Sequence, residues 1–280
     1  MPDVRDDPRL RGGRGFMYGT AWKESDTRRL VGLALAAGFR AIDTANQRKH
    51  YDEATVGLAL ADAYAAGSVR REDLFLQTKF THVRGQDHRL PYDAAAPVAT
   101  QVRQSFESSC AHLGTDMLDA YVLHGPSSRT ALTDDDVAAW RAMEAIHATG
   151  AVSALGISNV TPGQVASLLA LARVPPAVVQ NRCYASMGWD REMRALCRNH
   201  GIAYQAFSLL TANRSELAHP TVRAIAARTG RTPQQVVFGF ALAVGMIPLT
   251  GTTSRAHMDE DLAAARPIDD SDIRDLEALG

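Results

Sequence analysis

The chain has few cysteines and no excess of charge. Its three cysteines, Cys110, Cys183 and Cys197, form neither a disulfide framework nor a metal-ligand motif. The 30 basic and 31 acidic residues give a formal net charge of -1 and are interspersed along the chain, so no field of one sign attracts nucleic acid or an anionic membrane. These absences indicate a small-molecule partner, no metal site and a reducing cytoplasm.

The sequence also lacks long apolar runs. None reaches the length needed to cross a bilayer, and residues 1–15 lack the apolar centre of a secretory signal. We expect residues 1–15 to form a tail or a loose cover. With 46% hydrophobic residues, the segment 16–280 can bury the core of one barrel-sized domain.

What the sequence does contain is an alternation of short β-branched or aromatic runs with longer amphipathic segments. The intervening segments carry apolar residues at intervals of three and four, as amphipathic helices do. Eight such units of about thirty residues, without a linker, predict an α/β protein with a single (β/α)8 TIM barrel. The expected strands lie at 16–20, 40–45, 74–80, 118–125, 152–158, 177–182, 203–210 and 246–251.

Four side chains that handle protons lie at or just after the end of an apolar run: Asp43, Tyr51, Lys79 and His124. In a barrel of parallel strands, such ends meet at one mouth. A carboxylate, a phenol, an amine and an imidazole together can protonate a carbonyl oxygen while a hydride reaches its carbon. The sequence therefore predicts a reductase that converts an aldehyde or ketone into an alcohol.

Each member of this set has an expected task. We expect Asp43 to hold Lys79 charged, and Lys79 to lower the pKa of Tyr51 from its ordinary value of ~10, so that the phenol serves as general acid. His124 would orient the substrate carbonyl and share the proton.

The motifs and their order resemble the aldo-keto reductase family from Phe16 to the end of the chain. The resemblance implies a nicotinamide-dependent oxidoreductase whose Asp, Tyr, Lys and His tetrad maps onto Asp43, Tyr51, Lys79 and His124. The matching segments are GTAW at 19–22, IDTA at 42–45, EATVG at 53–57, LQTKF at 76–80, LDAYVLHG at 118–125, LGISN at 155–159, VVQNR at 178–182 and AFSLL at 206–210.

The tyrosine is where the sequence departs from the family pattern. The pattern places it five residues after the aspartate, where this chain has Arg48, and counting back from Gly57 gives His50. A two-residue insertion with a local shift returns Tyr51 to the site, and we adopt this assignment. If Tyr51 pointed away, His50 or Lys49 would face the substrate.

The resemblance also implies a cofactor site along the rim of the barrel. Ser158, Asn159 and Gln180 would bind the nicotinamide carboxamide, and Phe207 would stack on the ring. The loop 250–254 would hold phosphate at a helix N-terminus. The other expected cofactor residues are Gly19, Thr20, Ala21, Asp43, Ser208, Leu209, Thr250, Gly251, Thr252, Thr253, Ser254, Arg255, His257 and Asp261.

Cofactor choice is expected to depend on the loop after the last strand. NADPH-specific family members commonly have a lysine after the proline of that strand, where this chain has Leu249, and an arginine further on. Arg255 or His257 would take the place of that arginine. We predict NADPH, with NADH as the alternative.

The substrate pocket is expected to contain Trp22, His50, His82 and His124. His82 belongs to a polar insertion at 81–93, which either sets specificity at the mouth or is a solvated surface loop. Two other functions stay open: a lyase, isomerase or dehydratase without net hydride transfer, and a nicotinamide-sensing regulatory module. The sequence predicts neither the natural substrate nor the oligomeric state.

Overall fold

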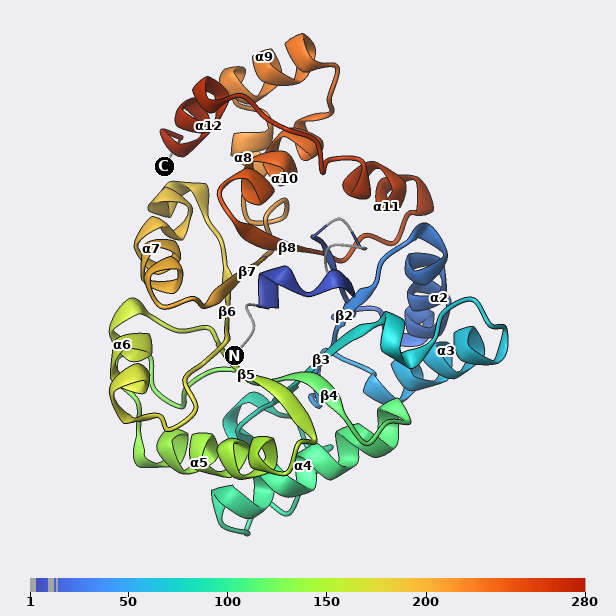
Figure 1. Cartoon of the computed structure of the whole chain (residues 1–280), viewed down its shortest axis with the longest axis vertical. Helices are drawn as coiled ribbons and strands as arrows, with labels where there is room; N and C mark the ends of the chain where they lie inside the picture. Colours follow the sequence, from blue (N-terminus) through green and yellow to red (C-terminus); the bar gives the residue numbers. More distant parts are fainter. Residues whose placement is uncertain (1–3, 10–12, 14, 280) are drawn as a thin grey trace.

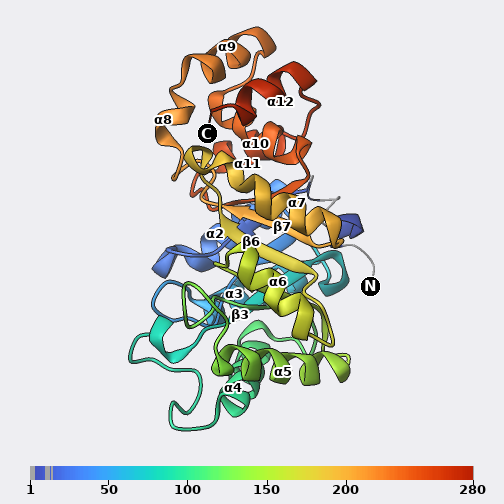
Figure 2. The same cartoon turned by 90° about the vertical axis from the view of Figure 1, so that its left-hand side faces the viewer.

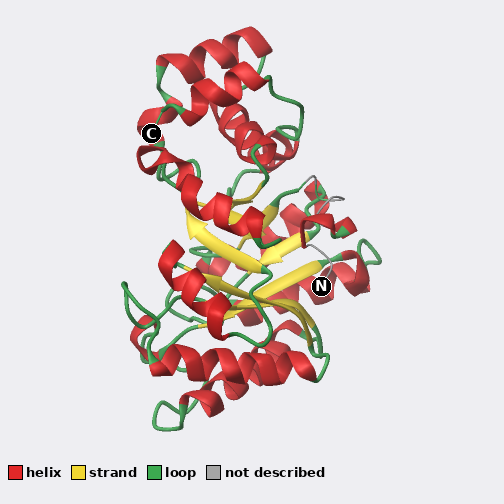
Figure 3. Cartoon of the chain, turned by 60° about the vertical axis from the view of Figure 1, so that its left-hand side comes forward, coloured by secondary structure: helices red, strands yellow, loops and turns green. Residues whose placement is uncertain are grey.

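A computed structural model of the chain describes residues 4–9, 13 and 15–279, and it confirms the predicted barrel. Eight parallel strands pair in chain order, and β8 closes onto β1. Figure 3 shows the strands at the centre with helices outside them. The strands are β1 Met17–Gly19, β2 Ala41–Asp43, β3 Phe75–Phe80, β4 Leu118–Leu123, β5 Val152–Ser158, β6 Val178–Arg182, β7 Ala203–Phe207 and β8 Met246–Thr250.

The helices form an outer ring around the strands (Figure 1). No helix among the described residues is long and apolar enough to span a membrane. The α-helices are α2 Thr27–Ala37, α3 Glu53–Ala65, α4 Val98–Leu113, α5 Asp134–Ala148, α6 Pro162–Leu171, α7 Arg191–Asn199, α8 Arg214–Leu217, α9 Pro220–Thr229, α10 Pro233–Ala243, α11 Arg255–Leu262 and α12 Asp270–Glu277. The 3-10 helices are η1 Val4–Asp6, η2 Glu24–Asp26, η3 Arg71–Asp73, η4 Val83–Gly85 and η5 Ala185–Asp190. Figures 1 and 2 show α9, α10 and α12 grouped at one end of the molecule.

Local sequence signals explain where several elements begin and end. Helix α6 starts after Thr161, which exchanges backbone and side-chain hydrogen bonds with Gln164 in a capping box. Helix α2 ends at Gly38, whose φ of 112° suits glycine. Strand β7 ends at Phe207, three residues before the expected end at 210, because Ser208 has a φ of 59° and leaves the strand conformation.

The interior of the barrel changes from apolar to polar along the strands. Its floor is a cluster of small and apolar side chains from all eight strands, including Met17, Phe75 and Leu249. Val4 packs into the same cluster, and η1 crosses the centre of the ring in Figure 1. The remainder of the expected tail or cover, at 1–3, 10–12 and 14, lies outside the described residues. Because this floor is apolar, the polar side chains of the barrel interior are concentrated toward the carboxyl ends of the strands.

Asp119 of β4 fastens the amino-terminal segment to the barrel. Its buried carboxylate accepts hydrogen bonds of 2.8 Å from the Leu76 backbone N–H and from Arg71, and Arg9 lies 2.5 Å from the other oxygen. We expect Asp119→Asn to lower the free energy of unfolding by about 2–3 kcal/mol, because hydrogen bonds to a buried charge are weakened or lost. Urea denaturation measures this change.

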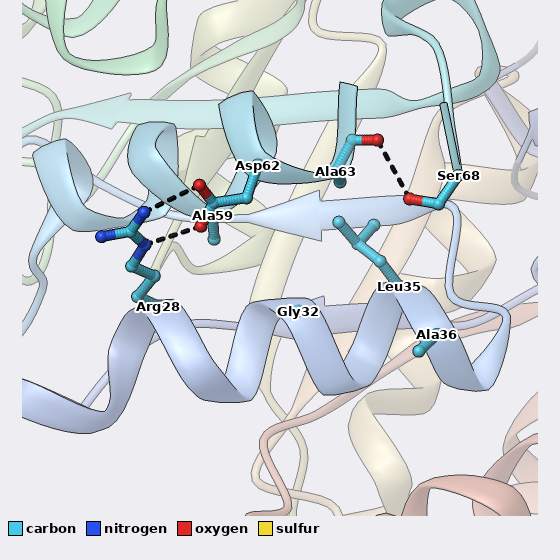
Figure 4. Close-up of a pocket in the computed structure, with 8 residues that line it drawn as sticks. All are labelled: Arg28, Gly32, Leu35, Ala36, Ala59, Asp62, Ala63 and Ser68. Atoms are coloured by element: carbon cyan, nitrogen blue, oxygen red, sulfur yellow. Dashed lines mark hydrogen bonds and ion pairs between the residues drawn. The ribbon is translucent and has the colours of Figure 1, made fainter. Parts of the chain in front are cut away.

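Asp62→Asn is the matched control for this prediction. Asp62 accepts hydrogen bonds of 2.6 and 2.7 Å from Arg28, but both side chains are exposed beside a pocket between α2 and α3 (Figure 4). Exposed ion pairs contribute little to stability. Equal losses in the two variants would show that burial of Asp119 does not matter.

Candidate active site

The ends of β2, β3 and β4 bring a carboxylate, an amine and an imidazole to the mouth of the barrel. Asp43 is the last residue of β2, Lys79 lies one residue before the end of β3, and His124 follows β4. Lys79 Nζ donates hydrogen bonds of 2.7 Å to both carboxylate oxygens of Asp43, and one of 2.8 Å to the Thr44 carbonyl. This ion pair is almost completely buried.

The inserted loop after β2 turns Tyr51 toward this ion pair. The backbone N–H groups of His50 and Tyr51 both donate to the Gln47 carbonyl, at 3.2 and 3.0 Å. Lys79 Nζ lies 5.3 Å from the centroid of the Tyr51 ring, and the His124 ring centroid is 5.8 Å away in an edge-to-face arrangement. Tyr51 thus joins the group despite the two-residue insertion.

His50 lies on the other side of this loop, against Trp22. The centroids of the two rings are 3.9 Å apart, and the Trp22 backbone N–H donates to the His50 carbonyl at 2.7 Å. Both residues line a pocket that Tyr51 and Lys49 also border. Trp22 is 68% exposed, so it provides an open apolar wall beside the phenol.

Burial controls the ionisation of Tyr51 and Lys79. It raises the pKa of the Tyr51 phenol, and the nearby Asp43 charge adds to the rise. This direction is opposite to the one expected from Lys79, whose ammonium is paired with Asp43. Burial also lowers the pKa of Lys79, while Asp43 opposes that change. Tyr51 is therefore a protonated phenol, as a proton donor must be.

Hydrogen bonds hold both the backbone and the ring of His124. Its backbone carbonyl accepts a hydrogen bond of 2.8 Å from the Asn159 side chain, and its Nδ1 lies 2.7 Å from Thr81 Oγ1. Burial lowers the pKa of His124 to about 3, with further contributions from the charges of Lys79 and His50. The imidazole is therefore neutral near pH 7.

Sequence reasoning missed Gln77 and Gln205, which form a hydrogen-bond network with Asp43 and the expected cofactor residue Gln180. The Gln77 and Gln180 side-chain amides donate to Asp43 Oδ1 at 2.7 and 3.0 Å. Both also donate to Gln205 Oε1, and Gln205 donates back to Gln77 at 2.9 Å. The missed signal was the two-residue period of β3, which places Gln77 on the same face as Lys79.

The expected nicotinamide residues gather at the ends of β5, β6 and β7. The Asn159 amide donates to Ser158 Oγ at 3.1 Å, and Ser158 pairs in register with Gln180. Phe207 ends β7 opposite Arg182, whose guanidinium carbon lies 5.5 Å from the centroid of the Phe207 ring. Arg182 therefore already covers one face of the aromatic ring.

The loop after β8 forms the start of α11. Ser254 Oγ accepts a hydrogen bond from the His257 backbone N–H, and Thr252 Oγ1 accepts one from Ser254. Thr250 donates a hydrogen bond of 2.7 Å to Asp261, and burial raises the pKa of Asp261 to about 6.

The other two residues expected at this loop, Gly251 and Thr253, are exposed.

The two positions expected to influence cofactor choice, Arg255 and Leu249, differ in exposure. Arg255 forms a 3.1 Å surface ion pair with Asp259. Leu249 is buried in the barrel floor and so cannot replace the lysine of the family pattern.

The structure adds Lys23 to the expected set of residues at this loop. Lys23 is buried and its Nζ donates to the Gly251 carbonyl, while the Tyr18 hydroxyl donates to the Thr252 carbonyl at 3.0 Å. Burial lowers the pKa of Lys23. Because β8 pairs with β1, the segment after β1 that carries Lys23 lies beside the loop after β8. The predicted barrel topology already implied this proximity.

The other expected residues lie nearby. Gly19 pairs in register with Asp43, and Thr20 donates hydrogen bonds of 3.0 Å from its backbone N–H and its hydroxyl to the Asp43 carbonyl. Ala21 follows Thr20 in the turn after β1, and Ser208 and Leu209 form the turn after β7.

His82 pairs with an acidic residue of α5. Its Nε2 lies 2.9 Å from Asp136 Oδ1 at the start of α5. The rest of the 81–93 insertion packs on the loop after β2: Gln47 donates to the Gly85 carbonyl at 2.7 Å, and Arg89 to the Arg48 carbonyl at 2.8 Å. A role for His82 in substrate binding stays a prediction.

Comparisons with known proteins find related sequences and structures for this barrel. The model of the aldo/keto reductase family matches residues 12–280. An aldo-keto reductase of Mycobacterium ulcerans is 31% identical over 240 residues, covering 85% of this chain and 77% of that protein. A glycerol 2-dehydrogenase (NADP(+)) of Hypocrea jecorina is 29% identical over 283 residues, covering 88% and 84%. The crystal structure of a silkworm aldo-keto reductase complexed with NADPH is similar with a TM-score of 0.80, at 25% identity, covering 95% of this chain and 84% of that one.

Proposed function

Since this chain belongs to the aldo/keto reductase family, we propose that it reduces an aldehyde or ketone to the corresponding alcohol with NADPH. The observation that carries the proposal is the joint position of Tyr51, Lys79, Asp43 and His124 at one mouth of the barrel. The alternative of a non-redox proton-transfer enzyme depends on a displaced tyrosine, and it loses that support with Tyr51 beside Lys79.

Each side chain has a defined task in this reaction. Tyr51 donates its phenolic proton to the carbonyl oxygen as negative charge develops there. Lys79, paired with Asp43, supplies a positive charge that stabilises the resulting phenolate. The neutral His124 contacts the same oxygen and orients it. A reduced nicotinamide bound beside these side chains would supply the hydride.

The residues along the rim fit a nicotinamide dinucleotide. The hydroxyl groups of Thr252 and Ser254, the start of α11 and the buried cation of Lys23 suit an anionic phosphate. Ser158, Asn159 and Gln180 offer polar atoms for a carboxamide. Phe207 would stack on the nicotinamide with the face that Arg182 leaves free.

NADPH is preferred over NADH in this proposal. The glycerol 2-dehydrogenase is named for NADP(+), and the silkworm structure contains NADPH. Arg255 at the start of α11 is exposed, and it would exchange its surface ion pair with Asp259 for a contact with a 2′-phosphate. Because Leu249 carries no charge, we expect the preference to be weaker than where a lysine assists the arginine.

Fluorescence titration with NADPH and NADH, followed by addition of a reactive aromatic aldehyde, tests the proposal. We expect tighter binding of NADPH and its oxidation by the aldehyde. Binding without oxidation by any of a panel of carbonyl compounds would favour the cofactor-sensing module. Absence of binding to either cofactor would contradict the reductase.

A further inference from the structure

Thr81, the first residue of the polar loop after β3, has a role that neither the motifs nor the comparisons assign. We propose that its hydroxyl fixes the tautomer of His124 with the ring proton on Nε2, so that this histidine donates a hydrogen bond to the substrate carbonyl oxygen. Thr81 is thus a positioning residue for the reduction, and the inference rests on the proposed function.

The hydrogen-bonding options of Thr81 determine the direction of this bond. Thr81 is buried, and its Oγ1 lies 2.7 Å from His124 Nδ1. Within the described part of the chain, Oγ1 makes no other hydrogen bond. A buried hydroxyl hydrogen without an acceptor is costly, so the hydroxyl donates and Nδ1 accepts. The proton of the neutral imidazole then belongs on Nε2.

Packing keeps the Thr81 hydroxyl aimed at His124. A Cβ added at Gly85 would lie 2.7 Å from the Thr81 methyl carbon. The methyl therefore occupies space that is open only because residue 85 has no side chain. The Tyr92 hydroxyl donates to the Thr81 carbonyl at 2.6 Å and fixes the backbone. The 81–93 insertion therefore supports the Thr81 side chain.

The backbone of His124 is fixed independently of its ring. Its N–H donates to the Phe80 carbonyl at 2.8 Å, and its carbonyl accepts from the Asn159 amide. With the proton on Nε2, the ring stabilises the charge that develops on the carbonyl oxygen. With the proton on Nδ1, a lone pair on Nε2 would face that oxygen and repel it.

Two substitutions at Thr81 test this inference. Thr81→Val keeps the shape but removes the hydroxyl, whereas Thr81→Ser keeps the hydroxyl and removes the methyl. We expect Thr81→Val to lower kcat for aldehyde reduction about tenfold, the size of one lost hydrogen bond, with unchanged NADPH affinity. Thr81→Ser should retain most of kcat. Equal losses in both variants, or full activity of Thr81→Val, would overturn the proposal.

Nitrogen NMR of the histidine side chains gives a readout that does not depend on turnover. We expect the wild-type protein to carry its His124 proton on Nε2, with Nδ1 at the resonance of a hydrogen-bonded acceptor. In Thr81→Val, part of the ring proton should move to Nδ1, so the Nδ1 resonance should shift toward that of a protonated nitrogen. A proton on Nδ1 in the wild type would contradict the inference. Failure of the reductase assay alone would instead contradict the proposed function.

Discussion

Tyr51→Phe is expected to lower kcat for aldehyde reduction by about 10²- to 10⁴-fold, the range of a lost general acid. The Tyr51 ring lies beside Lys79 and His124, and we assign its phenol to the substrate carbonyl and not to the cofactor phosphates, so NADPH affinity should remain within about twofold. Steady-state kinetics and fluorescence titration measure the two quantities. Because burial raises the pKa of Tyr51, ionisation of the phenol should not limit the activity of the wild type near pH 7.

His50→Ala is the matched control, because His50 precedes Tyr51 in the same insertion and stacks on Trp22. We expect its main effect to be on KM for the substrate, through loosening of the Trp22 wall. A loss of kcat larger than that of Tyr51→Phe would make His50 the proton donor and overturn the assignment.

Asp43→Ala is expected to lower the free energy of unfolding by about 3–5 kcal/mol, because it leaves the Lys79 ammonium buried without its counter-charge. Lys79 has no exposed side-chain surface, so water cannot replace the lost carboxylate. The amides of Gln77 and Gln180 lose an acceptor as well. Urea denaturation of the variant and the wild type measures the difference.

The double variant Asp43→Asn, Lys79→Met separates stability from catalysis. Removal of both charges should recover much of the stability lost in Asp43→Ala, because no unpaired charge remains buried. Aldehyde reduction should stay impaired, because the positive charge beside Tyr51 is absent. Full activity of the double variant would show that the ion pair serves the fold and not the reaction.

The strands and the strand-end residues could be predicted because they depend on local periodicity and on the parallel barrel. Asp43, Lys79 and His124 follow apolar runs whose ends must meet, and the structure brings them together. Their short distances arise from strand register, which the alternation of side chains already restricts.

The choice between His50 and Tyr51 could not be made from spacing alone. It depends on a turn at Gln47 and on the contact between His50 and Trp22, a residue that follows a different strand. The expected pKa of Tyr51 was wrong for a related reason. From the sequence, the Lys79 ammonium was expected to lower the pKa of the Tyr51 phenol. In the structure, burial and the charge of Asp43 raise this pKa instead.

Transfer of deuterium from NADPH labelled at C4 of the nicotinamide to an aromatic aldehyde tests hydride transfer at this site directly. We expect alcohol that carries deuterium on the former carbonyl carbon, from only one of the two C4 positions, with transfer nearly abolished in Tyr51→Phe. Product formed without nicotinamide, or alcohol without deuterium from either labelled position, would contradict hydride transfer at this site.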